Sequence, residues 1–207
     1  MVGLVFLAII GVYVLIVLGA TLTAIYVAKR YEARPLIRGM AGLGGFLLVT
    51  LPIFWDWAPV VMAHNHYCAK DAGFFLYKSP AQWMKENPGV AETLTYKYIS
   101  DAEKIDGGER YLLNQRIARE VRNSMRGWGI HQREELVVDQ QSGQILALYR
   151  DFWTGVTAST VGNNQGLRAW KVWMKYDGCE SGDPYYWKRS QEFSEVAKSY
   201  KRFGSSR

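Results

Sequence analysis

One uncharged stretch limits how this chain folds more than any other feature. Residues 2–28, VGLVFLAIIGVYVLIVLGATLTAIYVA, contain no Asp, Glu, Lys or Arg. A helix of that length rises about 40 Å, which is enough to cross the roughly 30 Å hydrocarbon layer of a bilayer at a tilt. The stretch therefore predicts a transmembrane helix.

A second uncharged run follows at residues 39–54, GMAGLGGFLLVTLPIF. Alone it is short for a span, but Leu36 and Ile37 on one side and Trp55 and Trp57 on the other extend it. Tryptophan is enriched where helices leave the bilayer, so the pair predicts a membrane interface. The run predicts a second transmembrane helix. A buried or interfacial segment is the alternative, because shorter apolar runs often form one.

The segment between the two runs is strongly basic. It contains one acidic residue, Glu32, and four basic residues: Lys29, Arg30, Arg34 and Arg38. Lys and Arg near helix ends keep a loop in the cytoplasm, so we expect loop 29–38 there and the N-terminus and everything after residue 63 outside it. The positive charge follows the first run instead of preceding it, which favours an uncleaved anchor over a signal peptide.

This topology divides the chain into a two-helix membrane anchor, residues 1–63, and a periplasmic domain, residues 64–207, at a bacterial inner membrane. The domain contains both cysteines, Cys68 and Cys179. Disulfides persist in such an oxidising compartment, so we expect the two to pair. A loop this long contributes roughly 4 kcal/mol in the chain-entropy model, less any strain. Two free thiols in the cytoplasm are the alternative.

Small residues in the two runs favour close packing of the helices. Gly19 with Thr23, and Ala41 with Gly45, have the small-x-x-x-small spacing that lets helix backbones approach. We expect the helices to pack as a hairpin or within a larger assembly. Neither run contains a charged residue, which argues against an ion pathway through this chain alone.

The strongest local signal after the anchor is a β-hairpin. Two runs, 130–139 and 144–153, flank the sequence QQSG, in which Gly143 supplies the positive φ that a tight turn needs. Residues 117–125 fit a strand or a helix equally well. Further strands are expected at 73–79, 95–100, 110–115 and 167–178.

Two helices are expected beside these strands. Ser79 and Pro80 have the form of an N-cap and a first helical position. Near the end of the chain, four apolar residues recur at helical spacing, which predicts an amphipathic helix: Phe193, Val196, Ala197 and Tyr200. The fold class is α+β, a two-helix transmembrane hairpin followed by an extracytoplasmic antiparallel-sheet domain with a C-terminal amphipathic helix.

His64, His66 and Cys68 alternate just after the second run. In an extended segment they share one face, and imidazole with thiolate is a credible zinc or copper set. Cys68 cannot both bind a metal and form the disulfide, so we expect no metal and no cofactor. His64 and His66 are then interface residues at the exit of the second helix.

The residues available for catalysis give no strong motif. His131 is the third histidine, and no nucleophile motif surrounds any serine that it could activate. Carboxylate pairs such as Glu134 with Glu135, or Asp139 with Asp151, could act as acid and base, but acids in a hairpin are usually solvated. We expect no enzyme, although an envelope enzyme or metal-binding protein using His64, His66 or His131 is an alternative.

Aromatic residues are dense in the domain. Most of them should be buried, but a surplus at the surface would mark a site for a partner. The candidates for such a site are Trp128, Trp170, Trp173, Tyr185 and Trp187. The net charge of +6 does not predict nucleic-acid binding, because the topology places the domain outside the cytoplasm.

Three segments suggest a family. These are CAKDAGFFLYKSPAQWMKENPGV, REELVVDQQSGQILALYRDFW and WKVWMKYDGC. Together they resemble an uncharacterised group of small bacterial exported or membrane-anchored proteins, over most of residues 68–179. The resemblance implies an exported domain closed by a disulfide, and it implies no catalytic residue.

The sequence therefore predicts a non-enzymatic periplasmic interaction protein anchored in the inner membrane. Its expected partners are the lipid bilayer and other envelope membrane proteins, with a homo-oligomer as one form. Within that class it is an accessory or small subunit of an envelope complex. An immunity or exclusion factor against an incoming toxin is an alternative.

Overall fold

A computed structural model describes residues 2–95, 102–155, 174–176, 178–179 and 186–203. Its contacts divide the chain into two units, Met1–Ala58 and Pro59–Arg207. The predicted division into a membrane anchor, residues 1–63, and a domain, residues 64–207, stays a prediction.

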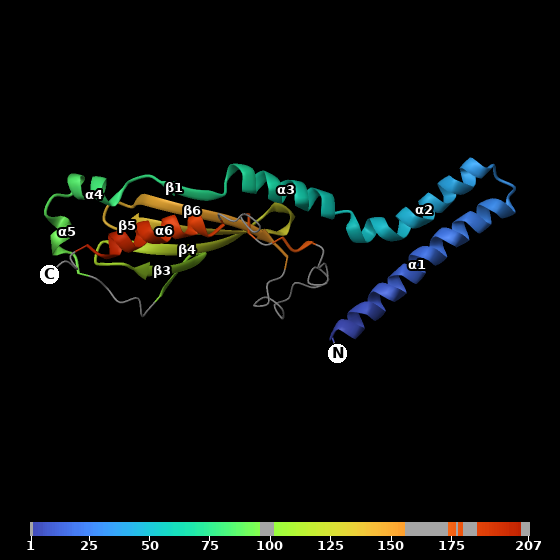
Figure 1. Cartoon of the computed structure of the whole chain (residues 1–207), viewed down its shortest axis with the longest axis horizontal. Coiled ribbons are helices and arrows are strands. Elements are labelled where there is room, and N and C mark those ends of the chain that lie inside the picture. The colour runs from blue at the N-terminus through green and yellow to red at the C-terminus, as the bar shows by residue number, and fades with distance from the viewer. Residues whose placement is uncertain (1, 96–101, 156–173, 177, 180–185, 204–207) are drawn as a thin grey trace. The chain divides into compact units, whose positions relative to one another are not determined.

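The first unit consists of two apolar helices, α1 (Val2–Arg30) and α2 (Pro35–Phe54), which form a hairpin (Figure 1). The segments Leu7–Arg30 and Pro35–Phe54, of 24 and 20 residues, are long and apolar enough to cross a membrane. The second helix begins at Pro35, earlier than the apolar run, because proline fits the first helical position.

Small residues lie where α1 and α2 meet. A Cβ added to Gly45 would lie 2.8 Å from the carbonyl oxygen of Ala20 and 3.0 Å from Cβ of Ala24. The predicted Ala41–Gly45 pair therefore contributes Gly45 to the contact. Gly19 does not take part, because a Cβ there would meet nothing within 4 Å.

The residues expected at the membrane interface lie at the ends of these helices. Two of the basic residues, Lys29 and Arg30, end α1, and Arg34 is the N-cap of α2. The fourth, Arg38, lies in the first turns of α2. Trp55 and Trp57 follow the other end of α2, and about half of each side chain is exposed.

The second unit is built on one antiparallel sheet with the strand order β1-β6-β5-β4-β3-β2. The strands are β1 (Gly73–Leu76), β2 (Glu103–Ile105), β3 (Gly108–Leu112), β4 (Ile117–Arg126), β5 (Ile130–Asp139) and β6 (Gln144–Thr154). The helices are α3 (Trp57–Lys70), α4 (Pro80–Glu86), α5 (Val90–Thr93) and α6 (Tyr186–Lys201). A 3₁₀ turn, η1 (Gly127–Gly129), joins β4 to β5.

The local predictions for this unit are largely confirmed. The predicted hairpin is β5 and β6, with Gly143 at φ +68° in its turn. The ambiguous segment 117–125 is the strand β4. The Ser79 side chain accepts a hydrogen bond from the Gln82 backbone, which makes it the predicted N-cap of α4.

Strand β3 begins earlier than the predicted 110–115, and it ends earlier because Asn114 turns the chain. Its side-chain Oδ1 accepts hydrogen bonds from the backbone N–H of Arg116 at 3.0 Å and of Ile117 at 2.8 Å. Most of the predicted strands 95–100 and 167–178 lies outside the described residues.

The core forms where α6 lies across the sheet (Figure 1). Phe193 contacts the rings of Phe74 and Tyr149, at centroid distances of 6.2 and 6.1 Å. Tyr200 contacts Trp83 of α4 at 6.5 Å. The predicted amphipathic face of the C-terminal helix is therefore confirmed, with Phe193, Ala197 and Tyr200 all buried.

Candidate functional site

The two cysteines are joined in a disulfide, the pair that the sequence predicted. Cys68 lies near the end of α3 and Cys179 lies 111 positions later, with their Cα atoms 5.1 Å apart. The described segment 174–176 runs beside the end of β6, where the Thr154 N–H donates to the Tyr176 carbonyl at 3.0 Å. The disulfide therefore ties α3 to the last part of the sheet.

His64 lies next to this disulfide and is buried, with 6% of its surface exposed. Its Nε2 is 3.2 Å from the carbonyl oxygen of Phe152 on β6, and its Nδ1 is 3.8 Å from Sγ of Cys68. The His64 ring also lies 5.5 Å from the ring of Tyr176. The histidine is therefore fixed between α3, β6 and the segment that leads to Cys179.

This arrangement corrects the extended segment expected for residues 64–68. The segment is helical, so His64 and Cys68, four residues apart, share one face, and His66 lies on another face and is exposed. The helix packs on the sheet through Tyr67, whose ring stacks on Phe152 at 5.2 Å. His64 is thus an interior residue of the second unit, in contrast to the interfacial position expected for it.

Asp151 is the charged group beside the disulfide. Its Oδ1 accepts hydrogen bonds from the backbone N–H of Cys179 at 2.8 Å and of Phe152 at 2.9 Å. Burial raises the pKa of Asp151, although these two donors oppose the shift. A Cβ added to Gly178 would lie 2.2 Å from the carboxylate, so the close approach of the chain requires glycine there.

Three donor groups converge at this place. Ligand atoms of His64, Cys68 and Cys179 all lie within 4.8 Å of one another. Over the residues that the structure describes, no other set of three or more His, Cys, Asp and Glu side chains meets this condition. The predicted set shared His64 and Cys68 with this group but contained His66 where the structure has Cys179.

His131, the third histidine considered, lies elsewhere on the sheet. It pairs across the strands with Trp153, and the two rings stack at 5.5 Å. Burial lowers the pKa of His131, which favours the neutral imidazole. His131 therefore does not join His64 in one site.

The carboxylates weighed as an acid–base pair are held in ion pairs instead. Glu134 accepts from Arg150 at 2.7 Å, and Glu135 accepts from Arg119 and from Arg133, the latter at 2.7 Å. These neighbouring glutamates are therefore neutralised separately, on opposite faces of β5.

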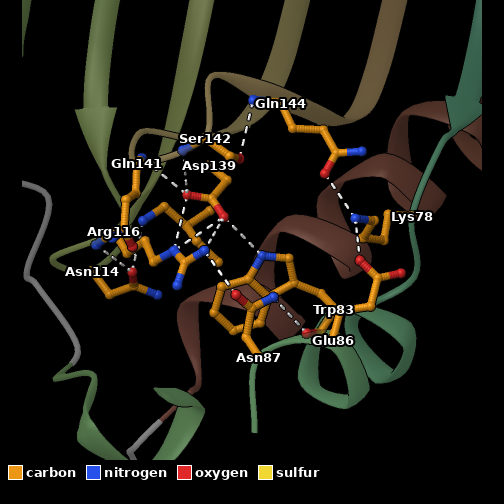
Figure 2. A network of polar contacts seen from close by, with 11 residues as sticks. Lys78, Trp83, Glu86, Asn87, Asn114, Arg116, Asp139, Gln141, Ser142 and Gln144 are labelled. Carbon is orange, nitrogen blue, oxygen red and sulfur yellow. Dashed lines mark hydrogen bonds and ion pairs between the residues drawn. The ribbon is translucent and has the colours of Figure 1, made fainter.

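Asp139, at the end of β5, is almost fully buried, with 2% exposed, which corrects the expectation that hairpin acids are solvated. Figure 2 shows its carboxylate between Arg116 and Trp83. Arg116 donates through Nε at 3.0 Å and Nη2 at 2.8 Å, and the Trp83 indole N–H donates at 3.1 Å. Burial works to raise the pKa of Asp139, but these donors outweigh it and hold the pKa below its ordinary value.

The same network joins the turn to the helices. Arg116 also donates to Asn87 at 2.8 Å, and its guanidinium lies 4.9 Å from the centre of the Trp83 ring. Asn114 donates to the carbonyl of Tyr200 on α6 at 3.0 Å. The two side-chain donors to Asp139, Arg116 and Trp83, are thus part of the packing between the turn and the helices, and the network has a structural role.

One of the five predicted interaction residues has a described side chain. Trp128, in η1, has 51% of its surface exposed. Trp170, Trp173 and Tyr185 lie outside the described residues, and Trp187 begins α6 with a side chain that is not described.

Trp128 belongs to a small surface at one end of the β5–β6 hairpin, formed with Met125, His131 and Trp153, which we call the tip. Its backbone is left-handed, with φ 63° and ψ 17°, a conformation that costs a non-glycine residue roughly 1–2 kcal/mol. The strand ends on either side of η1 contain Met125 and His131, which are cross-strand partners on β4 and β5, and His131 pairs in turn with Trp153 on β6. Met125 is 61% exposed. The tip is the set Met125, Trp128, His131 and Trp153.

Comparison of the chain with family models, curated proteins and solved structures finds no match. The resemblance over residues 68–179 therefore stays a prediction. The features that bear on function are the tip, the two apolar helices and the group around the disulfide.

Proposed function

We propose that this chain is a non-enzymatic interaction protein of a bacterial inner membrane. In this proposal α1 and α2 span the bilayer, loop 29–38 lies in the cytoplasm, and residues 64–207 lie in the periplasm. Two observations support it: both helices are long and apolar enough to span, and the disulfide is of a kind that persists outside the cytoplasm.

The observation that carries the binding role is the exposed aromatic residue at the tip. The side chain of Trp128 is half exposed. Its backbone also occupies the left-handed region, which glycine and asparagine adopt more easily than other residues. Strained residues of this kind persist mainly where function requires them. Tryptophan is also the residue most often found at the energetic centre of protein interfaces.

The neighbours of Trp128 fit the same role. Met125 adds a flexible apolar side chain, and the stacked pair of His131 and Trp153 adds an aromatic edge. Such a surface suits an apolar or aromatic patch on another protein. Because the anchor would hold the domain at the membrane, we propose an envelope membrane protein as the partner and an accessory subunit as the role.

Co-purification from native membranes tests this proposal. The chain is extracted in mild detergent, and the proteins that co-purify with it are compared between the parent and the double variant Trp128→Asn with Met125→Ser. Asparagine tolerates the left-handed backbone, so the variant removes the ring without breaking the turn. We expect the co-purifying proteins to be lost.

A matched control uses the same sheet. Ile145, in β6 beside the other turn, is also an exposed aliphatic residue, with 39% exposed. Ile145→Ser should leave the co-purifying proteins in place. The interaction role would be contradicted if the parent chain purifies without other proteins, or if the same proteins still co-purify with the double variant.

The topology needs a separate measurement. Alkaline phosphatase, which is active only after export, is fused after Arg207 or within the loop at Ala33, and green fluorescent protein is fused at the same places. We expect active phosphatase at Arg207 and fluorescence at Ala33. The reverse pattern would place the domain in the cytoplasm and remove this part of the proposal.

A further inference from the structure

We propose that reduction of the disulfide converts His64, Cys68 and Cys179 into a binding site for a single Cu⁺ ion. This inference goes beyond the proposed function and does not depend on it. It starts from the three donor groups, whose ligand atoms lie within 4.8 Å of one another. Metal–ligand distances of about 2.0–2.3 Å require donors roughly 3.5–4 Å apart. The His64 nitrogens are already 3.5 and 3.8 Å from Sγ of Cys68, and the two sulfurs, which are bonded to each other in the disulfide, must move apart after reduction.

The orientation of His64 supports a ligand role. Its Nε2 lies 3.2 Å from the Phe152 carbonyl, an acceptor, so Nε2 carries the proton and donates. Nδ1 then keeps its lone pair and lies 3.8 Å from Sγ of Cys68, while Nε2 lies 3.5 Å from the same sulfur, so binding through Nδ1 requires a small rotation of the ring. Metal-binding histidines are commonly fixed in this way, with the second ring nitrogen donating to a backbone carbonyl.

The position of Cys179 is fixed independently of the disulfide. Its backbone N–H donates to Asp151 at 2.8 Å, and its Sγ lies 3.6 Å from the same Phe152 carbonyl that His64 contacts. Cys68 is held on α3, which packs on the sheet through Tyr67. Both sulfurs should therefore stay beside His64 after the S–S bond is broken.

The chemistry of the donors selects the ion. Two thiolates and one imidazole form a soft set, and soft sulfur ligands select Cu⁺ or Zn²⁺. A closed Zn²⁺ site takes four protein ligands, and a Zn²⁺ site with two cysteines and one histidine keeps a water in the fourth position, whereas the group in the described part of the chain has three donors beside the buried His64. Three soft donors in a half-buried place therefore favour Cu⁺.

Opening of the site requires reduction of the disulfide, and a dithiol can supply the electrons and protons for it. The dithiol gives two electrons and two protons to the S–S bond, forming two cysteine thiols and its own disulfide. Binding of Cu⁺ then displaces one proton from each thiol, so two protons are released and no net electron is transferred to the metal. With the disulfide intact, the sulfurs are not thiolates and the site is closed to the ion.

The test is an anaerobic Cu⁺ titration of the full chain in detergent, with a coloured Cu⁺ chelator as competitor. The chain is used oxidised, or reduced with a dithiol that is then removed. We expect one Cu⁺ per reduced chain and no competitive binding by the oxidised chain. Equal binding by both forms, or none by the reduced form, would overturn the proposal.

Variants identify the ligands. Cys68→Ser should abolish competitive binding, and His64→Asn should weaken it by at least about tenfold, the loss usual even for outer-sphere partners. His66→Asn is the matched control, because His66 is exposed on another face of the same helix. Equal effects of the two histidine variants would remove His64 from the site.

Two measurements on the unmodified chain remain informative if a variant does not fold. X-ray absorption at the copper edge should show two sulfurs and one nitrogen around the ion, and an all-sulfur shell would contradict the role of His64. A Zn²⁺ titration under the same conditions should give weaker binding. Tighter binding of Zn²⁺ would overturn the assignment of Cu⁺.

Discussion

The two ends of the β5–β6 hairpin each hold a carboxylate, the buried Asp139 and the partly buried Asp151, and they hold it in different ways. At the turn, Asp139 faces Arg116 and Trp83, whose side chains donate to it, and its pKa is lowered. At the opposite end, Asp151 is held by backbone N–H groups, and burial raises its pKa.

The turn end of the hairpin therefore has a stabilising role, whereas the other end contains the candidate functional groups. At the turn end Arg116 forms an ion pair with Asp139 and also donates to Asn87 at the end of α4, while Asn114 donates to a carbonyl of α6. The other end gathers the disulfide, the buried His64 and the strained Trp128. Perturbed and strained groups of this kind concentrate at functional sites, which is why both proposals lie at that end.

Removal of Arg116 should have the largest effect on stability. Arg116→Met leaves the Asp139 carboxylate buried without its cation, which typically costs about 3–5 kcal/mol. Urea unfolding of the detergent-solubilised chain, followed by tryptophan fluorescence, measures the free energy of unfolding. A loss below about 1 kcal/mol would show that the turn end is not the stabilising one.

Substitution of Asp139 should have a smaller effect that depends on pH. Asp139→Asn loses charge-assisted hydrogen bonds and should cost about 2 kcal/mol at neutral pH. The lowered pKa of Asp139 means that its contribution is present above the ordinary value of 3.8 and is lost as the pH falls through the folded-state value. The stability difference between parent and variant should therefore shrink below pH 3.8, and a constant difference would contradict this account.

Gly178 tests the packing at the other end. Gly178→Ala would bring a methyl group against the Asp151 carboxylate, so the segment must shift at a cost of about 1–2 kcal/mol. Unfolding of the reduced and the oxidised chain should both show the loss. Gly127→Ala is the control, because a Cβ there meets nothing within 4 Å.

Asp151 should show the smallest effect, with the opposite dependence on pH. Its raised pKa means that its contribution is fully present below the ordinary value of 3.8 and is lost as the pH rises through the folded-state value. Asp151→Asn, which stays neutral, should match the parent at low pH and be more stable by a few tenths of a kcal/mol at neutral pH. If Asp151→Asn were instead less stable than the parent at neutral pH, as expected for Asp139→Asn, the contrast between the two ends would be contradicted.

The features that sequence could predict are those set by local pattern. The turn at Gly143, the cap at Ser79 and the apolar face of α6 each depend on neighbouring residues, and each is confirmed. The pairing of Cys68 with Cys179 followed from counting cysteines and from the expected compartment, and the structure has that pair.

The contacts at the candidate site could not be predicted in this way. His64, His66 and Cys68 alternate like residues on a strand, yet the i, i+4 spacing of His64 and Cys68 fits a helix equally well. Packing of Tyr67 on Phe152, far away in sequence, decides for the helix. The approach of Asp151 to Cys179 is likewise a tertiary contact that leaves no local signal.

Photo-cross-linking in native membranes tests the central claim, that the tip binds an envelope membrane protein, most directly. A benzophenone amino acid replaces Trp128, and in a second version it replaces Ile145 at the opposite end of the hairpin. The account predicts a discrete cross-link to a membrane protein from position 128 and none from position 145. Equal labelling from both positions, or no product from position 128, would contradict it.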